Sequence, residues 1–295
     1  MRRILASPPA RWPGSASSRS GPGVPARALA VLAVLLAAAF VVAPRTLAAS
    51  RPDGGFADQR SLVQTLGKAF VEYWRSGNRD LPPSLNRVVD YWSRYHVAKA
   101  VIAAILLIVL VALGVLLWKA FLRSGALGAV RRAALASTGV LVTIPALFSL
   151  LVVVANVQGA VAPFASLLSL LPAGASDGAL ADTIHQVRQG LAEPAGAGHR
   201  TPPALEVMIS DYALYHLTLV VTGFVVAVVL TGVSVVLWTA SARTGSPDRR
   251  TRRVLRSFGV LAAMSSLIMF VVVVANMTNV ADPAPALLAF FDGGW

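Results

Sequence analysis

The residue types best suited to chemistry occur in this chain in two similar segments, about 120 positions apart. Residues 90–96 read Asp-Tyr-Trp-Ser-Arg-Tyr-His, and residues 211–216 read Asp-Tyr-Ala-Leu-Tyr-His, which is one residue shorter. A carboxylate, a phenol and an imidazole can exchange protons or bind a metal ion. The same residue types also anchor helices at a membrane surface, where Tyr and Trp lie at the level of the lipid headgroups. Because both segments directly precede a long apolar stretch, both interpretations have to be weighed.

Two asparagines extend this pattern. Each stands in a Val-Ala-Asn sequence near the end of a second apolar stretch, at Asn156 and at Asn276. Such a side chain at the end of a membrane helix forms an interhelical hydrogen bond or a helix C-cap, or else contacts a solute. The candidate site predicted at the outer rim of the membrane therefore comprises Asp90, Tyr95, His96, Asn156, Asp211, Tyr215, His216 and Asn276.

Three interpretations of this rim are open. The structural one is interfacial anchoring, with each histidine hydrogen-bonded to the facing helix. In the second, His96 and His216 are axial ligands of a haem held between the two halves of the chain. In the third, these histidines bind a metal ion together with Asp90 and Asp211, although ligand distances between separate helices do not follow from spacing. The structural interpretation, which we favour, predicts neither a cofactor nor a metal, and the lack of cysteine excludes disulfides and thiolate ligands.

The elements that position these residues are expected to be membrane helices. Hydrophobic residues make up 56% of the chain and charged residues only 13%, a balance outside the range of water-soluble domains. A helix needs about 20 apolar residues to cross the hydrocarbon core of a bilayer. Four segments reach that length, at approximately 97–121, 133–157, 217–240 and 254–280. We therefore predict an all-α integral membrane protein with four core spans.

The distribution of charge predicts the orientation of these spans. The loop between the first two spans carries Lys119, Arg123, Arg131 and Arg132 without an acid, and the loop between the last two carries six arginines with Asp248 alone. By the positive-inside rule, both loops and the basic N-terminus lie in the cytoplasm, which places the C-terminus outside. The net charge of +13 is thus an orientation signal, and short loops without a recognisable binding module predict no nucleic-acid partner. The excess of arginine over lysine, 23 to 3, is typical of a high-GC bacterial genome and indicates a bacterial cytoplasmic membrane.

The N-terminal segment has two parts. Residues 1–27 are basic and rich in Pro, Gly and Ser, which predicts a disordered cytoplasmic tail. The apolar run of residues 28–43 is long for the core of a signal peptide and short for a membrane span. Residues 28–48 are therefore either a cleaved signal peptide or a retained first span, and both alternatives give the same topology for the rest of the chain.

The chain after this segment reads as two copies of one unit. Leu-Trp recurs at 117–118 and 237–238, Ser-x-Gly-Val-Leu at 137–141 and 257–261, and Val-Ala-Asn at 154–156 and 274–276. We predict a tandem duplication of a two-helix transmembrane unit, with repeat 1 at residues 49–171 and repeat 2 at residues 172–295. Because both copies run from outside to inside and back, the repeats should be related by a pseudo-twofold axis along the membrane normal.

Each repeat is also predicted to begin with an amphipathic outer helix. In residues 56–77, the apolar residues Leu62, Leu66, Phe70 and Trp74 recur at i, i+4 spacing on one stripe. That stripe could lie on the outer leaflet or against the membrane helices. Residues 180–191 form the shorter counterpart in repeat 2.

Two further outer elements are expected in each repeat. No helix breaker lies between residues 84 and 114, so this segment should run from outside the membrane directly into the first span. After the second span, Pro163 and Pro283 are each followed by a pair of leucines. This pattern predicts a short helix that lies in the outer interface or forms a docking patch for another protein.

These features favour a non-enzymatic structural or interaction protein whose outer helices form a cap that binds a protein partner or a second copy of the chain. The sequence lacks the zinc, phosphate-loop and nucleophile motifs of common enzymes. The alternative is a small-solute transporter or channel component that uses the interface between the repeats, and a second alternative is a membrane b-type haem protein. Ion-coupled transport is disfavoured because the middle of each predicted span lacks an ionisable side chain.

Overall fold

The computed structural model describes residues 23–50, 55–123, 129–172, 177–193, 201–245 and 248–294. Within these residues the chain forms helices and turns without a strand, as the all-α prediction requires. Five of the helices are long and apolar enough to cross a membrane, so the protein is a multi-pass membrane protein. The helices are α1 (Gly23–Ala48), α2 (Gln59–Ser76), α3 (Pro83–Arg123), α4 (Ala129–Val161), α5 (Pro163–Leu168), α6 (Gly178–Ala192), α7 (Pro203–Arg243), α8 (Arg249–Ala281) and α9 (Pro283–Phe291).

Helix α1 is longer than the apolar run that predicts it. It begins at Gly23 and continues through Pro44 to Ala48, a length of 26 residues. At 1.5 Å per residue this is about 39 Å, enough to cross a hydrocarbon core of about 30 Å. Residues 23–27 of the predicted tail are therefore helical, whereas residues 1–22 lie outside the described part of the chain. Whether α1 is cleaved as a signal peptide stays a prediction.

Helices α3 and α7 are twice as long as a membrane is thick. Each has 41 residues, or about 60 Å. The prediction that each outer segment runs without a break into the following span is therefore confirmed. Each begins at a proline, which has no N–H to leave unpaired at a helix start. The bounds of α3 and α7 differ by 120 positions, and so do those of α4 and α8. Both helix pairs therefore have matching lengths as well as matching sequences.

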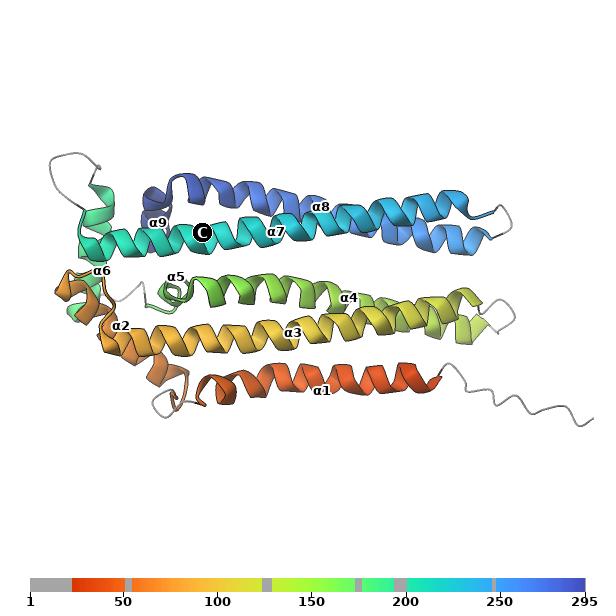
Figure 1. The fold of residues 1–295 in the computed structure, drawn as a ribbon, viewed down its shortest axis with the longest axis horizontal. Helices are drawn as coiled ribbons and strands as arrows, with labels where there is room; N and C mark the ends of the chain where they lie inside the picture. The colour runs from red at the N-terminus through yellow and green to blue at the C-terminus, as the bar shows by residue number, and fades with distance from the viewer. Residues whose placement is uncertain are drawn as a thin grey trace, which may run out of the picture.

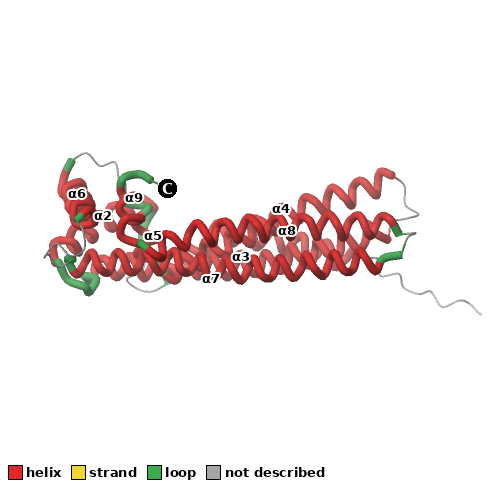
Figure 2. Tube along the Cα trace, turned by 90° about the horizontal axis from the view of Figure 1, so that it is seen from above, coloured by secondary structure: helices red, strands yellow, loops and turns green. Residues whose placement is uncertain are grey.

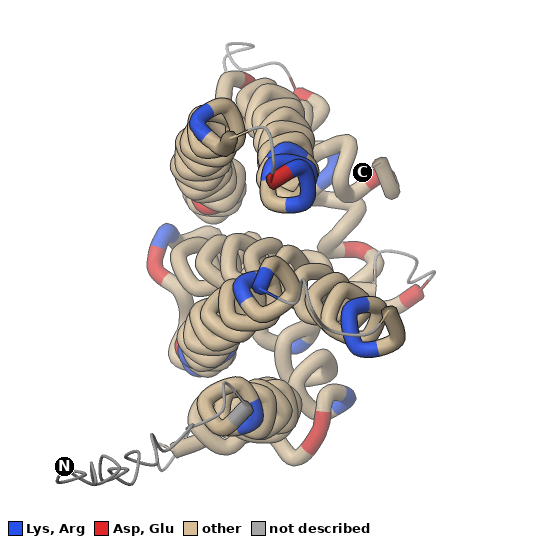
Figure 3. The backbone as a smooth tube through the Cα atoms, turned by 90° about the vertical axis from the view of Figure 1, so that its right-hand side faces the viewer, with Lys and Arg blue, Asp and Glu red and all other residues tan. Residues whose placement is uncertain are grey.

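The membrane helices form three layers (Figure 1). Helix α1 packs against α3, the α3–α4 pair forms hairpin 1, and the α7–α8 pair forms hairpin 2. Viewed from its end, the bundle shows hairpin 1 between α1 and hairpin 2 (Figure 3). The two hairpins meet along α4 and α7. Basic residues gather at the end of the long helices that Figure 3 faces, and the short helices gather at the opposite end.

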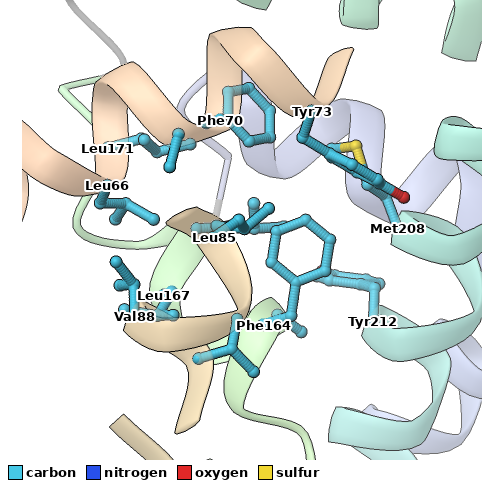
Figure 4. Packing of buried hydrophobic residues seen from close by; sticks show 14 of the residues in the cluster. Leu66, Phe70, Tyr73, Leu85, Val88, Phe164, Leu167, Leu171, Met208 and Tyr212 are labelled. Carbon is cyan, nitrogen blue, oxygen red and sulfur yellow. The ribbon is translucent and has the colours of Figure 1, made fainter. Parts of the chain in front are cut away.

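The short helices and the projecting ends of α3 and α7 form a separate folded unit, which we call the cap (Figure 2). Its core is the largest hydrophobic cluster in the described chain and takes side chains from both halves. Figure 4 shows how these side chains converge, from α2 (Leu66, Phe70, Tyr73), α3 (Leu85, Val88), α5 (Phe164, Leu167) and α7 (Met208, Tyr212). The cap therefore joins the two halves outside the membrane spans.

Helix α2 has well-defined ends. The carboxylate of Asp58 accepts a hydrogen bond from the Ser61 amide at 2.7 Å, and the Ser61 hydroxyl accepts one from the Asp58 amide. This reciprocal pair satisfies donors that a helix N-terminus leaves free. At the other end, Gly77 adopts a φ of 64°, the left-handed conformation that glycine enters without strain. The helix predicted over 56–77 is thus confirmed, with its ends set by local hydrogen bonds.

The apolar faces of the short helices lie inside the cap. Leu66 and Phe70 have no exposed surface, so the stripe of α2 packs on protein and not on the outer leaflet. Trp74 also packs against this core but is only partly buried, whereas Tyr73, next to the predicted stripe, is fully buried. The leucines after Pro163 and Pro283 are also largely in the core, with Leu167 and Leu287 at 0% exposure. The predicted interfacial or docking role of these leucines is therefore replaced by a role in the cap core.

Two glycines let a tryptophan lie against the facing helix in each hairpin. A Cβ atom on Gly139 would come within 2.9 Å of the Trp118 ring, and one on Gly259 within 2.9 Å of Trp238. The two tryptophans differ in their surroundings. The Trp118 ring makes edge contacts with Phe121 and with Phe258 of hairpin 2, whereas Trp238 is 44% exposed.

Candidate functional site at the rim

Each histidine of the predicted site is hydrogen-bonded to the asparagine of its own repeat. Nδ1 of His96 on α3 lies 2.9 Å from Oδ1 of Asn156 on α4. Nδ1 of His216 on α7 lies 2.7 Å from Oδ1 of Asn276 on α8. The expected hydrogen bond from each histidine to the facing helix is therefore present. These two pairs form the rim, the level at which the cap meets the membrane spans.

The asparagine amides determine which histidine nitrogen carries the proton. Nδ2 of Asn156 donates to the carbonyl of Val152 at 2.7 Å, and Nδ2 of Asn276 donates to that of Val272 at 2.7 Å. The Oδ1 atoms consequently face the imidazoles as acceptors. We infer that Nδ1 of each histidine carries the proton and donates it, which leaves Nε2 as an acceptor. Nε2 of His96 is buried without a hydrogen-bond partner.

The two histidine pairs differ at one neighbouring position. The His96 ring lies flat against Gly159, where an added Cβ would meet three ring atoms at 2.8–2.9 Å. The equivalent position in α8 is Asn279, whose Nδ2 lies 3.3 Å from Nδ1 of His216. Because Nδ1 holds a single proton, Asn279 can donate to it only in the other tautomer. His216 therefore has a second possible partner that His96 lacks, and comparison of the repeats at positions 159 and 279 would have revealed this difference.

The two aspartates are not equivalent, contrary to the sequence alignment with its one-residue gap. Helices α3 and α7 run in a gapless register of 120 positions, so Asp211 corresponds to Tyr91 and not to Asp90. One residue turns a helix by about 100°. Asp90 is exposed, whereas the partly buried Asp211 accepts a hydrogen bond from the amide of Ala165 at 2.7 Å. Asp211 thus fastens α7 to the start of α5 in the other half.

The two tyrosines also serve contacts within the protein. The Tyr95 ring stacks on Trp92 at 5.3 Å between centroids and lies 5.2 Å from the Lys99 ammonium. The Tyr215 ring contacts His216 edge-on, and its backbone carbonyl accepts a hydrogen bond from Gln158 at 3.1 Å. Gln158 is buried on α4 and was not among the predicted site residues. The position equivalent to Gln158 in the second half of the chain is Thr278, so repetition between the two halves does not point to this glutamine.

Polar contacts in the cap also cross between the halves. The indole of Trp74 on α2 donates to Oε1 of Gln186 on α6 at 2.7 Å, and the Tyr73 hydroxyl donates to the Ala204 carbonyl at 3.2 Å. Burial raises the pKa of Tyr73 to about 12, partly opposed by the charge of Arg79. Arg79 itself pairs with Glu206 of α7 at 2.5 Å, but this pair is exposed and adds little stability.

The rim residues form hydrogen bonds with one another and with neighbouring helices. Of the eight predicted residues, four form two histidine–asparagine pairs, one in each hairpin, and Asp211 and Tyr215 are hydrogen-bonded to the other half. Tyr95 stacks on Trp92 of its own helix, and Asp90 is exposed. Among the described residues, no three His, Asp or Glu side chains gather as metal ligands, so the four-residue metal site is not formed. Hydrogen bonds between helices within a membrane contribute about 0.6 kcal/mol on average. The pairs therefore set the helix register more than they add to total stability.

Comparison with known proteins gives no relative to argue from. No family model, curated protein or solved structure matches the chain. Any function has to be inferred from the chain itself.

Proposed function

We propose that this chain is a non-enzymatic membrane protein that binds a protein partner through its cap. The observation that supports this most is that the histidines and asparagines of the rim, the groups best suited to chemistry, bind each other within each hairpin. The cap meanwhile has a core built from both halves. A rigid, preformed unit outside the membrane loses little conformational entropy on binding. This favours an interaction protein over an enzyme.

The surface proposed for the partner is the polar face of α2. Arg60, Gln64, Lys68 and Arg75 are all exposed. They are separated by four, four and seven residues, or about one, one and two helical turns, so they lie on one side of the helix. Among the described residues, the ion pairs of the chain involve Arg79 and Arg188 and none of these basic side chains. We call Arg60, Lys68 and Arg75, with Gln64 among them, the basic face; the neighbouring Glu72 accepts a hydrogen bond from the Ser84 hydroxyl. An acidic protein surface is the complement that it fits.

The proposed location of the cap, outside the cytoplasm, follows from the charge at the other end of the bundle. The basic loops lie there, and by the positive-inside rule that end is cytoplasmic in a bacterial inner membrane. The cap and the C-terminus would then lie outside. A partner of the basic face is accordingly an extracytoplasmic protein, or the outer domain of another membrane protein.

A photo-reactive amino acid at Gln64 tests the proposal in native membranes. Gln189, exposed on α6, is the matched control outside the basic face. We expect one discrete cross-linked species from position 64 that is absent from position 189 and disappears in the double variant R60E/K68E. Identical products from both positions, or a product that survives the charge reversal, would contradict the proposal.

Transport of a small solute between the halves is the alternative. A path there would have to pass the contact of α4 with α7, where Val154 is buried near Ala227 and Met269. This packing supports a fixed contact and disfavours a water-filled path. Because the native chain lacks cysteine, single cysteines along α4 and α7 can be labelled from the aqueous side. Labelling at mid-span positions would overturn the preference for an interaction protein.

A further inference from the structure

Four arginines line one open hollow along the side of α8, at the end of the bundle opposite the cap. The hollow has a volume of about 560 Å³ and is lined by Arg249, Arg252, Arg253 and Arg256, together with Ser257 and Val260. Figure 3 looks at this end of the bundle. Guanidinium groups bind phosphate oxygens with two parallel hydrogen bonds, so such a cluster is suited to a phosphate ester.

Asp248 is the acid nearest in sequence to these arginines, and none of the four forms an ion pair with it. The ion pairs of the described residues lie at the cap, and none of the four takes part in one. Arg252 donates from one terminal nitrogen to the Thr244 carbonyl at 2.7 Å, and its Nε is buried without a partner. The nearby Asp248 carboxylate is engaged by the amide and hydroxyl of Thr251. The hollow is therefore a concentrated positive site whose complement is not supplied by these residues.

The same side of α8 continues into an apolar groove. A second hollow of about 460 Å³ lies between α7 and α8 and is lined on α8 by Ala263, Ser266, Leu267 and Phe270. At about 100° per residue, Arg256 falls on the same side of the helix as Ala263, Leu267 and Phe270. The positive hollow and the apolar groove thus follow each other along one face, as a headgroup and its acyl chains do.

Repeat 1 does not carry this arrangement. The positions equivalent to Arg249, Arg253 and Arg256 are Ala129, Ala133 and Ala136. In the groove, Ala227 of α7 is matched by the larger Leu107 of α3. Membrane orientation needs basic residues in both loops, but it does not require four arginines that line one hollow at the end of a groove. The concentration in repeat 2 therefore points to a ligand.

We infer that α8 binds an anionic phospholipid, with its phosphate among the four arginines and an acyl chain in the groove between α7 and α8. Basic pockets at the membrane surface bind anionic headgroups, and each basic residue there adds to the affinity. The apolar wall of the groove supplies the acyl contact, with the Ala263 side chain leaving room for the chain.

The test is lipid binding by the purified full-length protein in nanodiscs of phosphatidylcholine containing a minor fraction of phosphatidylglycerol, followed by native mass spectrometry. The variant R253Q/R256Q removes two exposed arginines of the hollow. The matched control R123Q/R131Q removes two exposed arginines from the same end of hairpin 1. We expect the preference for phosphatidylglycerol to fall about thirtyfold in the first variant and clearly less in the control, which lowers only the general positive charge at this end of the bundle. Equal losses in both would show non-specific attraction to positive charge and overturn the site.

A second pair of variants tests the acyl part. A263W fills the groove, and I268W adds the same ring at an exposed position outside it. Loss of bound phosphatidylglycerol in A263W alone supports the inference. If A263W binds phosphatidylglycerol as tightly as I268W does, the groove does not hold an acyl chain and the inference is wrong. Competition by soluble glycerol phosphate with the same affinity as the lipid would likewise show that the hollow binds phosphate alone.

Discussion

The difference between the two histidine–asparagine pairs makes a prediction that the sequence alone does not suggest. Replacing Asn156 with alanine leaves the Nδ1–H of His96 without its acceptor at 2.9 Å. Moving the proton to Nε2 offers no escape, because that atom is also buried without a partner. Gly159, against the ring, has no side chain that could substitute. An unsatisfied buried donor costs about 1–3 kcal/mol, and interhelical hydrogen bonds in membranes reach about 1.7 kcal/mol, so we expect N156A to cost about 1–2 kcal/mol.

The equivalent change in repeat 2 should cost less. When Asn276 is replaced with alanine, His216 can move its proton to Nε2 and accept a hydrogen bond from Nδ2 of Asn279, already 3.3 Å away. We expect N276A to cost about 0.5 kcal/mol, near the average for a membrane hydrogen bond. The double variant N276A/N279A removes the substitute and should cost about as much as N156A.

The assay is the free energy of unfolding in mixed micelles, measured by circular dichroism during titration with a denaturing detergent. The single variant N279A is the control, because its loss alone leaves the His216–Asn276 bond intact. If N276A costs as much as N156A and N279A adds nothing to it, the assigned tautomers and the compensating role of Asn279 are refuted.

Two further predictions concern the packing of the hairpins and the cap. G139A should destabilise the protein more than G259A. Both added methyl groups meet a tryptophan ring at 2.9 Å, but Trp118 is confined by two aromatic rings, whereas Trp238 is 44% exposed and can move. Equal thermal stabilities of the two variants would contradict this. Tyr73 should titrate near pH 12 in the folded protein, against 10.0 for a free tyrosine. The raised pKa therefore stabilises the fold fully below pH 10, and this stabilisation is lost as the pH rises toward 12. Difference absorbance titrations of the protein and of Y73F measure this, and a Tyr73 that titrates near pH 10 would count against its burial.

The sequence predicts the helices well because their signals are local. Apolar length suffices for α3, α4, α7 and α8, even though α4 contains Pro145, and the i, i+4 stripe suffices for α2. What that stripe packs against is a different matter. An amphipathic face looks the same whether it meets lipid or protein, so the burial of Phe70 in a core shared by both halves could not be predicted.

The sequence predicts which residues belong to the candidate site but not which of them form hydrogen bonds with each other. Contacts between separate helices depend on their rotation and height, which residue spacing within one helix does not reveal. One signal was present all the same, since both histidine–asparagine pairs are separated by 60 positions. The alignment of Asp90 with Asp211 failed for a related reason, because a one-residue gap is easily introduced in a sequence but would rotate every later side chain of a continuous helix by about 100°.

One cap core joins the two halves of the chain, and a cross-link across it tests this most directly. Trp74 and Gln186 come from opposite halves, and their side chains meet at 2.7 Å. In a chain without native cysteine, the pair W74C/Q186C can be treated with a short bis-maleimide in native membranes. We predict efficient cross-linking within single chains, and little with R60C/Q186C, whose first cysteine is exposed on α2 but lies about 21 Å along the helix from position 74. Failure of W74C and Q186C to react with each other, or reaction only between different chains, would contradict the shared cap.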